Sequence, residues 1–219
     1  MHLTVSLHNN DGLGPKYDHN FKLSGVVYSH LKKHNTEEAG AIHDSHKRSA
    51  FVLSEIHPVS KKTGESWFRM GTSSDYVLKM AGKAFAPSTK ITVGAVEYQV
   101  TGLTIEEPVV RPGEFVTLSP ILLKDKKTNQ SIVHDTPGYK DTLEMAINAQ
   151  IKNYMKVEGT VRVIHFEPQA VRNRTIKGRT VLAQKGRMLL DGEEEQLRFL
   201  VNHGIGRSPA LGFGMVVRV

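Results

Sequence analysis

The sequence has no cysteine, which excludes disulfide bonds, thiolate zinc sites and cysteine nucleophiles. It has no run near the roughly 18 apolar residues that span a membrane, and its first residues, MHLTVSLHNNDG, enter a strand pattern without a signal-peptide core. We therefore predict a cytoplasmic protein with no membrane partner. Aromatic residues are scarce at 7%, so no base-stacking platform is signalled, and the single tryptophan, Trp67, is expected in the core.

Positive charge is abundant, because the chain of 219 residues carries a formal net charge of +7. This points to an anionic partner, either nucleic acid or an anionic surface. Between positions 162 and 187 the cations face a single acid, Glu167, and a ribbon of one sign predicts a track for phosphates. The cations are Arg162, Arg172, Arg174, Lys177, Arg179, Lys185 and Arg187.

Hydrophobic periodicity predicts a strand-helix-strand-strand-helix-strand order for residues 1–108. Leu3, Val5 and Leu7 alternate as in a half-buried strand, and Leu23 and Leu31 recur at helical spacing. The predicted elements are a strand at 2–8, a helix from Asp18 through Leu31, strands at 50–56 and 66–70, a helix from Ser73 or Ser74 to about Phe85, and an extended segment at 91–105 with a break near Gly94 or Gly102.

The same order repeats after the linker EEPVVRPGE, over residues 114–219. The predicted elements are a strand at 115–123, a helix at 139–156 ended by Gly159, strands at 160–166 and 180–190 with a long connection between them, a helix at 193–203 capped by Asp191, and a strand at 215–219. The fold class is therefore α+β, with two tandem ferredoxin-like (βαββαβ) units. Residues 1–108 form the expected N-terminal domain and residues 114–219 the C-terminal domain.

A glycine-rich stretch, VNHGIGRSPALGFGMVVRV, lies between the last predicted helix and the last strand. Gly204 is a natural C-cap for that helix. Nucleotide-binding fingerprints place their glycines after a strand and before a helix, so the reversed order here excludes a dinucleotide site or a P-loop. A loop rich in backbone amides and poor in bulk can approach a phosphate backbone closely, or can pack the two repeats together.

The sequence resembles one family in GIGRSPALGFGMV, in TLSPI at Thr117–Ile121 and in FVLSEI at Phe51–Ile56, which follows a histidine-bearing loop. It is similar to the CRISPR-associated endoribonucleases, sixth of the Cas series and part of the RAMP superfamily, which cut precursor CRISPR RNA within its repeats. The resemblance implies cleavage without a metal or other cofactor. The 2′-hydroxyl of the RNA would attack the adjacent phosphate, giving 2′,3′-cyclic phosphate and 5′-hydroxyl ends.

The resemblance also implies site residues. His43 lies in the loop position of the family histidine, Tyr28 on the first helix and Lys47 soon after the histidine; His46 and Arg48 are the alternatives for the histidine and the lysine. The expected RNA-binding residues are Arg172, Arg174, Lys177, Arg179, Lys185, Arg187, Gly206, Arg207, Ser208, Gly212 and Gly214.

Other interpretations stay open from the residues alone. Tyr28 can be simple amphipathic packing, whereas His43 and His46 with Asp44 lack a second cluster that would complete a metal site. A non-catalytic RNA-binding subunit of a CRISPR effector complex would have the same fold, and so would a module for an unrelated anionic ligand. The implied partner is CRISPR repeat RNA, precursor and mature; other effector subunits, retention of the product and a homodimer are left open.

Overall fold

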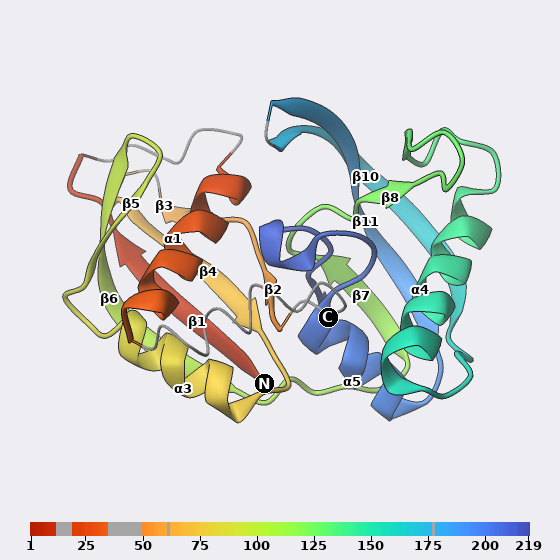
Figure 1. Cartoon of the computed structure of the whole chain (residues 1–219), viewed down its shortest axis with the longest axis horizontal. Helices are drawn as coiled ribbons and strands as arrows, with labels where there is room; N and C mark the ends of the chain where they lie inside the picture. Colours follow the sequence, from red (N-terminus) through yellow and green to blue (C-terminus); the bar gives the residue numbers. More distant parts are fainter. Residues whose placement is uncertain (12–18, 35–49, 61, 177) are drawn as a thin grey trace.

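The computed structural model describes residues 1–11, 19–34, 50–60, 62–176 and 178–219. It contains two α+β units side by side (Figure 1). The elements of the first unit are β1 His2–His8, α1 Asn20–His34, β2 Val52–Leu53, β3 His57–Ser60, β4 Glu65–Gly71, α3 Asp75–Ala84, β5 Lys90–Val93 and β6 Val96–Glu106. None of the described helices is long and apolar enough to cross a membrane.

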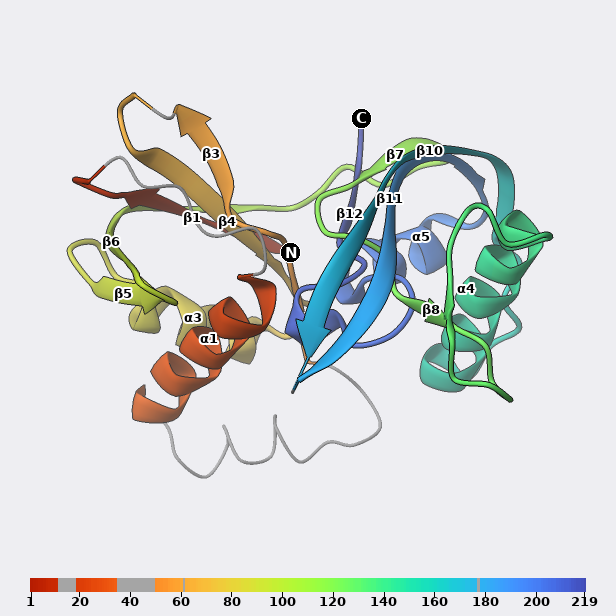
Figure 2. The ribbon, with the colours of Figure 1, turned by 90° about the horizontal axis from the view of Figure 1, so that it is seen from above.

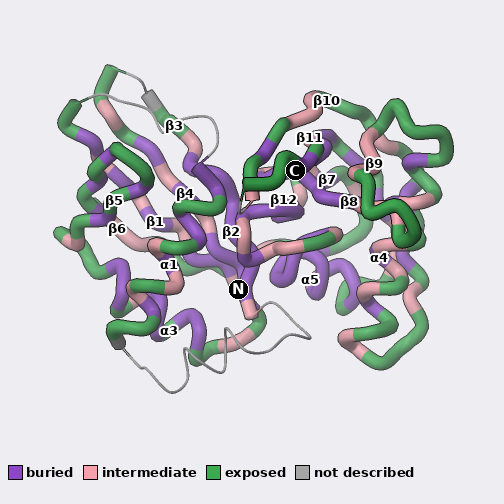
Figure 3. Tube along the Cα trace, turned by 45° about the horizontal axis from the view of Figure 1, so that its top comes forward, coloured by how far each residue is buried: buried purple, intermediate pink, exposed green. Residues whose placement is uncertain are grey.

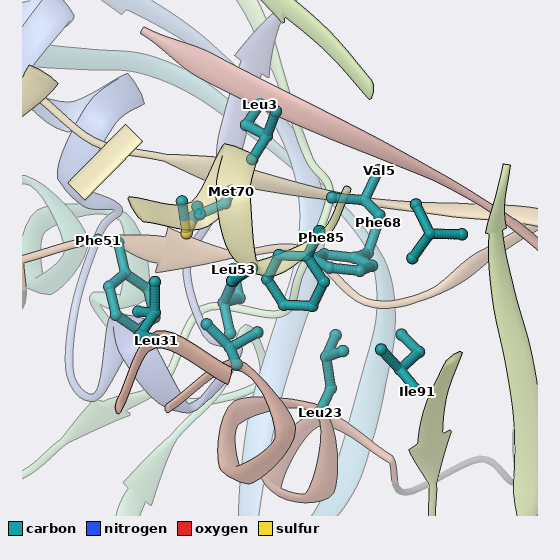
Figure 4. Packing of buried hydrophobic residues seen from close by; sticks show 14 of the residues in the cluster. Leu3, Val5, Leu23, Leu31, Phe51, Leu53, Phe68, Met70, Phe85 and Ile91 are labelled. Atoms are coloured by element: carbon teal, nitrogen blue, oxygen red, sulfur yellow. The ribbon is translucent and has the colours of Figure 1, made fainter. Parts of the chain in front are cut away.

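The first unit has the predicted βαββαβ order, with β5 added as a hairpin partner of β6. Its sheet runs β2-β4-β1-β6-β5 with antiparallel neighbours, and β3 pairs with the outer part of β4. Helices α1 and α3 lie on one side of this sheet (Figure 2). The buried positions of β1, Leu3, Val5 and Leu7, point to that side, where Leu23, Phe68 and Phe85 complete the core shown in Figure 4.

The second unit repeats the order with a longer central hairpin. Its elements are β7 Gly113–Thr117, β8 Leu123–Lys124, β9 Ser131–Ile132, α4 Tyr139–Met155, β10 Arg162–Ile176, β11 Arg179–Asp191, α5 Glu194–His203, the 3-10 turn η1 Pro209–Leu211 and β12 Val216–Arg218. The sheet runs β10-β11-β7-β12, and its core is formed with Leu143, Ile147 and Ile151 of α4. The chain therefore has two tandem ferredoxin-like units, as the sequence predicts.

Three predicted features of the second unit are wrong. The long connection between positions 166 and 180 is instead strand, because β10 and β11 form one continuous antiparallel ladder; Pro168 and two register shifts hide the alternation. Asp191 ends β11 and pairs with Arg162, so Glu193 occupies the N-cap of α5. The helix at 139–156 ends on Lys156 in the left-handed region, since Gly159 has another role: its Cα packs against the backbone of Asn148.

Two predicted strands are shorter than expected. The segment at 50–56 pairs with β4 only over Val52–Leu53, and the chain then continues into β3, a further strand beyond the predicted ones. The segment at 115–123 is divided into β7 and β8. Backbone hydrogen bonds nevertheless continue past both breaks. Ser54 N–H donates to the carbonyl of Arg69 at 2.9 Å, and Ile121 and Gln184 form an isolated antiparallel bridge.

The glycine-rich loop, residues 204–214, is wedged between the two units and closes this seam. Ala210 belongs to the hydrophobic core of the first unit, although it lies in the second half of the chain. Asn20, at the start of α1, donates a hydrogen bond from Nδ2 to the carbonyl of Gly212 at 2.6 Å. Figure 1 shows this segment in dark blue at the centre of the molecule, and Figure 3 shows β2 and α5 beside it as largely buried.

The N-terminal residues also dock across the seam. The amino group of Met1 donates to Oδ1 of Asn202 at 2.8 Å, and the ring of His2 hydrogen bonds to the carbonyl of Val201 at 3.2 Å. Ser119 Oγ donates to the carbonyl of Leu53 at 2.9 Å. These contacts join β1 and β2 to α5 and to the segment after β7, so the two units are held in one relative orientation.

We expect Gly214→Ala to lower the free energy of unfolding by more than about 2 kcal/mol. Gly214 has φ of 72°, and an added Cβ would lie 1.9 Å from the carbonyl oxygen of Ile205. Gly82 of α3 is the control, because nothing lies within 4 Å of a Cβ added there. Gly82→Ala should leave stability unchanged or raise it by about 1 kcal/mol. Denaturant unfolding of both variants measures the difference, and an equal stability for both would contradict the wedge.

Candidate nucleic-acid interface and cleavage site

Tyr28 lies on α1 and packs against the hydrophobic core of the first unit. Its ring is tilted against Phe51, with 5.2 Å between the ring centroids. Burial raises the pKa of the Tyr28 hydroxyl above its ordinary value. The group therefore stays protonated near neutral pH, where it can donate a hydrogen bond or a proton but does not serve as a ready-made phenolate base.

The predicted histidine and lysine positions, His43, His46, Lys47 and Arg48, lie outside the described residues, so the structure does not test them. On one side of them the described chain ends at His34, the last residue of α1. On the other side it resumes at Ala50, whose carbonyl accepts a hydrogen bond from Thr72 Oγ1 at 2.7 Å. Ala50 leads directly into Phe51, the ring partner of Tyr28. The chain therefore resumes next to a residue that contacts Tyr28.

The basic ribbon at 162–187 has acidic neighbours in the folded structure that its own sequence does not contain. Arg187 pairs with Glu114 of the neighbouring strand β7 at 2.9 Å, and Arg162 pairs with Asp191 at 2.5 Å. Both pairs are exposed, so a polyanion can compete for these arginines in water. The acids come from β7 and from the end of β11, which a scan of the ribbon alone does not include.

Two further predicted RNA-binding residues converge on one acid of the first unit. Arg174 and Lys185 both form ion pairs with Glu55, with 2.8 Å between Lys185 Nζ and Glu55 Oε2. The Arg174 side chain is only 3% exposed. Burial alone would raise the pKa of Glu55, but the two cations outweigh it and hold that pKa below its ordinary value. Arg174 and Lys185 therefore lock the β10–β11 hairpin onto the first unit.

Other predicted cations remain at the surface. Arg179 is exposed near the hairpin tip, Arg172 is half-buried on β10, and Lys177 lies outside the described residues. Arg207 is exposed on the glycine-rich loop. It lines a hollow of about 340 Å³ together with Gln150, Tyr154, Phe199, His203, Gly206, Ser208 and Pro209. Arg207 and Ser208 thus carry the polar side of the loop, as an RNA ledge would require.

The amides of the glycine-rich loop are largely used within the protein. Gly206 N–H donates to Gln150 Oε1 at 3.1 Å, Arg207 N–H to the carbonyl of Leu122 at 2.9 Å, and Gly214 N–H to the carbonyl of Pro120 at 2.9 Å. Gly212 packs against Asn20, leaving no space for a Cβ. The loop was predicted either to approach a phosphate backbone or to pack the two repeats together. These loop contacts are those of the second role.

Sequence reasoning placed one conspicuous residue wrongly. Trp67 was expected in the core, but its side chain is half-exposed. The signal was present in the alternation of β4, where Phe68 and Met70 are buried and Trp67 therefore shares the opposite face with Glu65 and Arg69. Glu55 was also missed, because a lone acid in a strand gives no sign of a distant partner.

The described part of the chain holds no group of three His, Cys, Asp or Glu residues that could bind a metal ion. What it brings together is a tyrosine on α1, a seam closed by a glycine-rich loop, and a basic hairpin bound across that seam. This arrangement defines a tandem ferredoxin-like protein with a basic surface.

Comparison with known proteins identifies the family. The family model described as "CRISPR associated protein Cas6, C-terminal" matches residues 105–217. The chain therefore belongs to the Cas6 family, as its resemblance indicated. No curated protein sequence matches the chain.

Solved structures extend this likeness over the whole fold. A structure described as "CRISPR associated protein Cas6" is 18% identical with a TM-score of 0.80, covering 100% of this chain and 99% of the other. A Cas6-related protein from Pyrococcus furiosus is 16% identical with a TM-score of 0.79, covering 100% and 98%. A Cas6 product complex is 14% identical with a TM-score of 0.72, also covering 100% and 98%. At these identities the likeness shows the fold alone.

We expect Glu55→Gln to lower the free energy of unfolding by about 3 kcal/mol, because it leaves Arg174 buried without a carboxylate. The exposed pair offers a control, since Glu114→Gln should cost less than about 1 kcal/mol. The pKa of Glu55 is lowered from 4.5. The ion pairs of Glu55 therefore contribute to the free energy of unfolding above that pH, and this contribution is lost as the pH falls through the folded-state pKa of Glu55. Denaturant unfolding at several pH values tests this, and equal losses for both variants would contradict it.

Proposed function

We propose that the protein is a metal-independent endoribonuclease that cuts precursor CRISPR RNA within its repeats. The membership of the chain in the Cas6 family carries the proposal. Structures similar to it include ones described as a Cas6 product complex, a Cas6 substrate mimic complex and a RAMP protein binding different RNA substrates. The net charge of +7 and the exposed Arg179 and Arg207 supply the electrostatic attraction that RNA binding needs.

The proposed reaction is a transesterification within the RNA. The 2′-oxygen of one nucleotide attacks the adjacent phosphorus, the P–O5′ bond breaks, and the products are a 2′,3′-cyclic phosphate and a 5′-hydroxyl. One group must take the proton of the 2′-hydroxyl and another must protonate the leaving 5′-oxygen. His43, or His46 in its place, is assigned to these proton transfers because an unperturbed imidazole titrates near pH 6.5.

Tyr28 and a cation complete the proposed site. With its raised pKa, Tyr28 is suited to donate a hydrogen bond to the phosphate or to the leaving oxygen. Lys47 or Arg48 would balance the charge that develops on the phosphorane. The described contacts around Tyr28 support its part of this assignment. Tyr28 packs on Phe51, and Glu55, four residues further along the chain, pairs with both Arg174 and Lys185 of the β10–β11 hairpin.

The first test distinguishes metal-independent cleavage by the 2′-hydroxyl from metal-dependent cleavage and from RNA binding without cleavage. Repeat RNA incubated in EDTA should be cut, whereas the same RNA with one 2′-deoxy residue 5′ to the scissile phosphate should bind and stay intact, because the nucleophile is missing. End-group analysis should find the cyclic phosphate. Loss of cleavage in EDTA, or cutting of the deoxy substrate, would sink the mechanism. Binding of both RNAs without cleavage of either would favour the non-catalytic RNA-binding subunit.

The second test addresses the residues. His43→Ala should lower the cleavage rate by about a hundredfold or more and leave binding largely intact, because it removes a proton-transfer group. Tyr28→Phe keeps the ring packed on Phe51 and should cost about tenfold in rate without loss of stability. Single-turnover kinetics measures both. If His46→Ala abolishes cleavage and His43→Ala does not, the histidine assignment is reversed.

A further inference from the structure

The uncovered face of the first sheet carries a hollow of about 560 Å³ beside Trp67. That volume lies within the range of small-molecule sites. The hollow is lined by Thr4, Ser6, Leu7, Val59, Glu65, Ser66, Trp67, Arg69, Thr101 and Gly102. Its lining residues belong to strands β1, β4 and β6 and to the outer strand β3. Helices α1 and α3 lie on the other side of this sheet (Figure 2).

The ring of Trp67 is held in place by a stacking contact with His57 of β3. His57 is its partner across the β3–β4 ladder, and the two rings stack at 4.4 Å between centroids with 21° between their planes. The ring of His57 is itself fixed, because its Nε2 lies 3.0 Å from the carbonyl of Leu118 in the second unit. Burial lowers the pKa of His57 to about 4, so near neutral pH the ring is uncharged and Nε2 is the donor. His57 does not line the hollow, whereas Trp67 and Arg69 both do.

The floor of the hollow is made of small side chains. Ser6 faces Trp67 on one neighbouring strand and Gly102 on the other. A Cβ added to Gly102 would lie 3.9 Å from the side chain of Ser6, so no bulky group fills the space beside the indole. Thr4 and Thr101 add hydroxyl groups. This hollow, called the slot below, has an aromatic side chain in its wall and hydroxyl groups in its floor, and it is suited to a planar ligand with a polar edge.

The charges around the slot select the kind of planar ligand. Glu65 and Arg69 flank Trp67 on β4, so one negative and one positive group lie at opposite sides of the ring. Arg69 is further tied to Thr4 Oγ1 at 3.1 Å and to Glu106 at 2.9 Å. This slot has no excess of positive charge for a phosphate. It can instead take a neutral nucleobase, with hydroxyl and carboxylate groups for the base edge. Arg69, whose Cζ lies over the Trp67 ring at 5.6 Å from its centroid, forms with Trp67 the surface against which the base would pack.

We propose that this slot binds one unpaired nucleobase of the RNA, packed against the Trp67–Arg69 pair and read along its edge by Thr4, Ser6 or Glu65. The proposal deepens the proposed function and rests on it for the source of the base. Phosphates on either side of the bound nucleotide would point away from the sheet, toward solvent. Trp67 would thus contribute to affinity and base preference and not to bond cleavage.

The single tryptophan of the chain makes the test direct. The intact protein is titrated with tetraribonucleotides of each base and with an abasic tetramer, while Trp67 fluorescence is recorded. Stacking should change the emission saturably with at least one base and not with the abasic chain. Absence of any change with all of them, and with repeat RNA whose binding is confirmed by anisotropy, would overturn the proposal and leave the proposed function standing.

Variants give a second reading. Trp67→Leu should weaken binding of repeat RNA about tenfold, and Trp67→Phe should weaken it less, because a ring is retained. Gly102→Leu fills the slot without altering Trp67 and should weaken binding to a similar degree. Tyr76→Leu is the control, since Tyr76 is a 37% exposed aromatic on α3, on the helix side of the sheet. Circular dichroism and unfolding midpoints check folding.

The outcomes separate the two hypotheses. If Trp67→Leu does not fold, Gly102→Leu decides. Wild-type affinity in Gly102→Leu, or equal losses in Trp67→Leu and Tyr76→Leu, would contradict the slot while repeat cleavage could still be observed. If the wild-type protein neither binds nor cuts repeat RNA, the proposed function fails; a base-dependent change in Trp67 emission with the tetramers would then still support a nucleobase site, and its absence would refute one.

Discussion

The structure depends on close backbone contact at the glycine-rich loop. The carbonyl of Ile205 lies so near the Cα of Gly214 that no side chain fits, and Gly212 leaves no room beside Asn20. The two units have separate sheets and largely separate cores, so without this loop their relative orientation would rest on scattered polar contacts. By inserting Ala210 into the first core, the loop turns a linkage between two units into a packed interface.

That interface explains why some cations of the basic ribbon are buried. Once the units are fixed, the β10–β11 hairpin reaches the first unit, and Arg174 loses its hydration there. A buried guanidinium is tolerated only with a partner, and Glu55 supplies one. The pairing contributes less to net stability than to orientation, because desolvation of three charged groups offsets most of their attraction. Its effect is to keep the exposed Arg179 and the helix carrying Tyr28 on parts of the molecule that cannot shift independently.

The sequence predicts this fold well at the level of elements and poorly at the level of partners. The periodicity of Leu3, Val5 and Leu7, or of Leu143, Ile147 and Ile151, depends on one face meeting one core, and such local patterns are visible in a single chain. The β10–β11 ladder was missed because an exposed strand interrupted by Pro168 has no apolar alternation to read. Glu55 and Arg174 are 119 positions apart, and only the tertiary structure brings them together.

The residues of the candidate site also differ in how far the sequence could place them. The residues assigned to cleavage follow from the family resemblance and lie, apart from Tyr28, outside the described residues. Trp67 could have been placed from the alternation of β4, but the scarcity of aromatic residues argued against a stacking site. Scarcity is a weak argument here, because one rigid ring suffices for one base. A ring that moved freely would lose entropy on stacking, whereas His57, fixed by Leu118 of the other unit, has already removed that freedom.

A neutral slot and a basic surface would make different contributions to RNA recognition. Contacts between phosphates and cations such as Arg179 and Arg207 weaken steeply with salt and carry no sequence information. Packing of a base against Trp67 and hydrogen bonds to the base edge depend little on salt, and they do carry sequence information. The fixed seam allows the two to act on one RNA, since it holds the sheet face that bears Trp67 at a constant distance from the basic hairpin. In this proposal the loop first noticed for its glycines serves RNA recognition indirectly, by fixing the geometry between surfaces that it does not itself form.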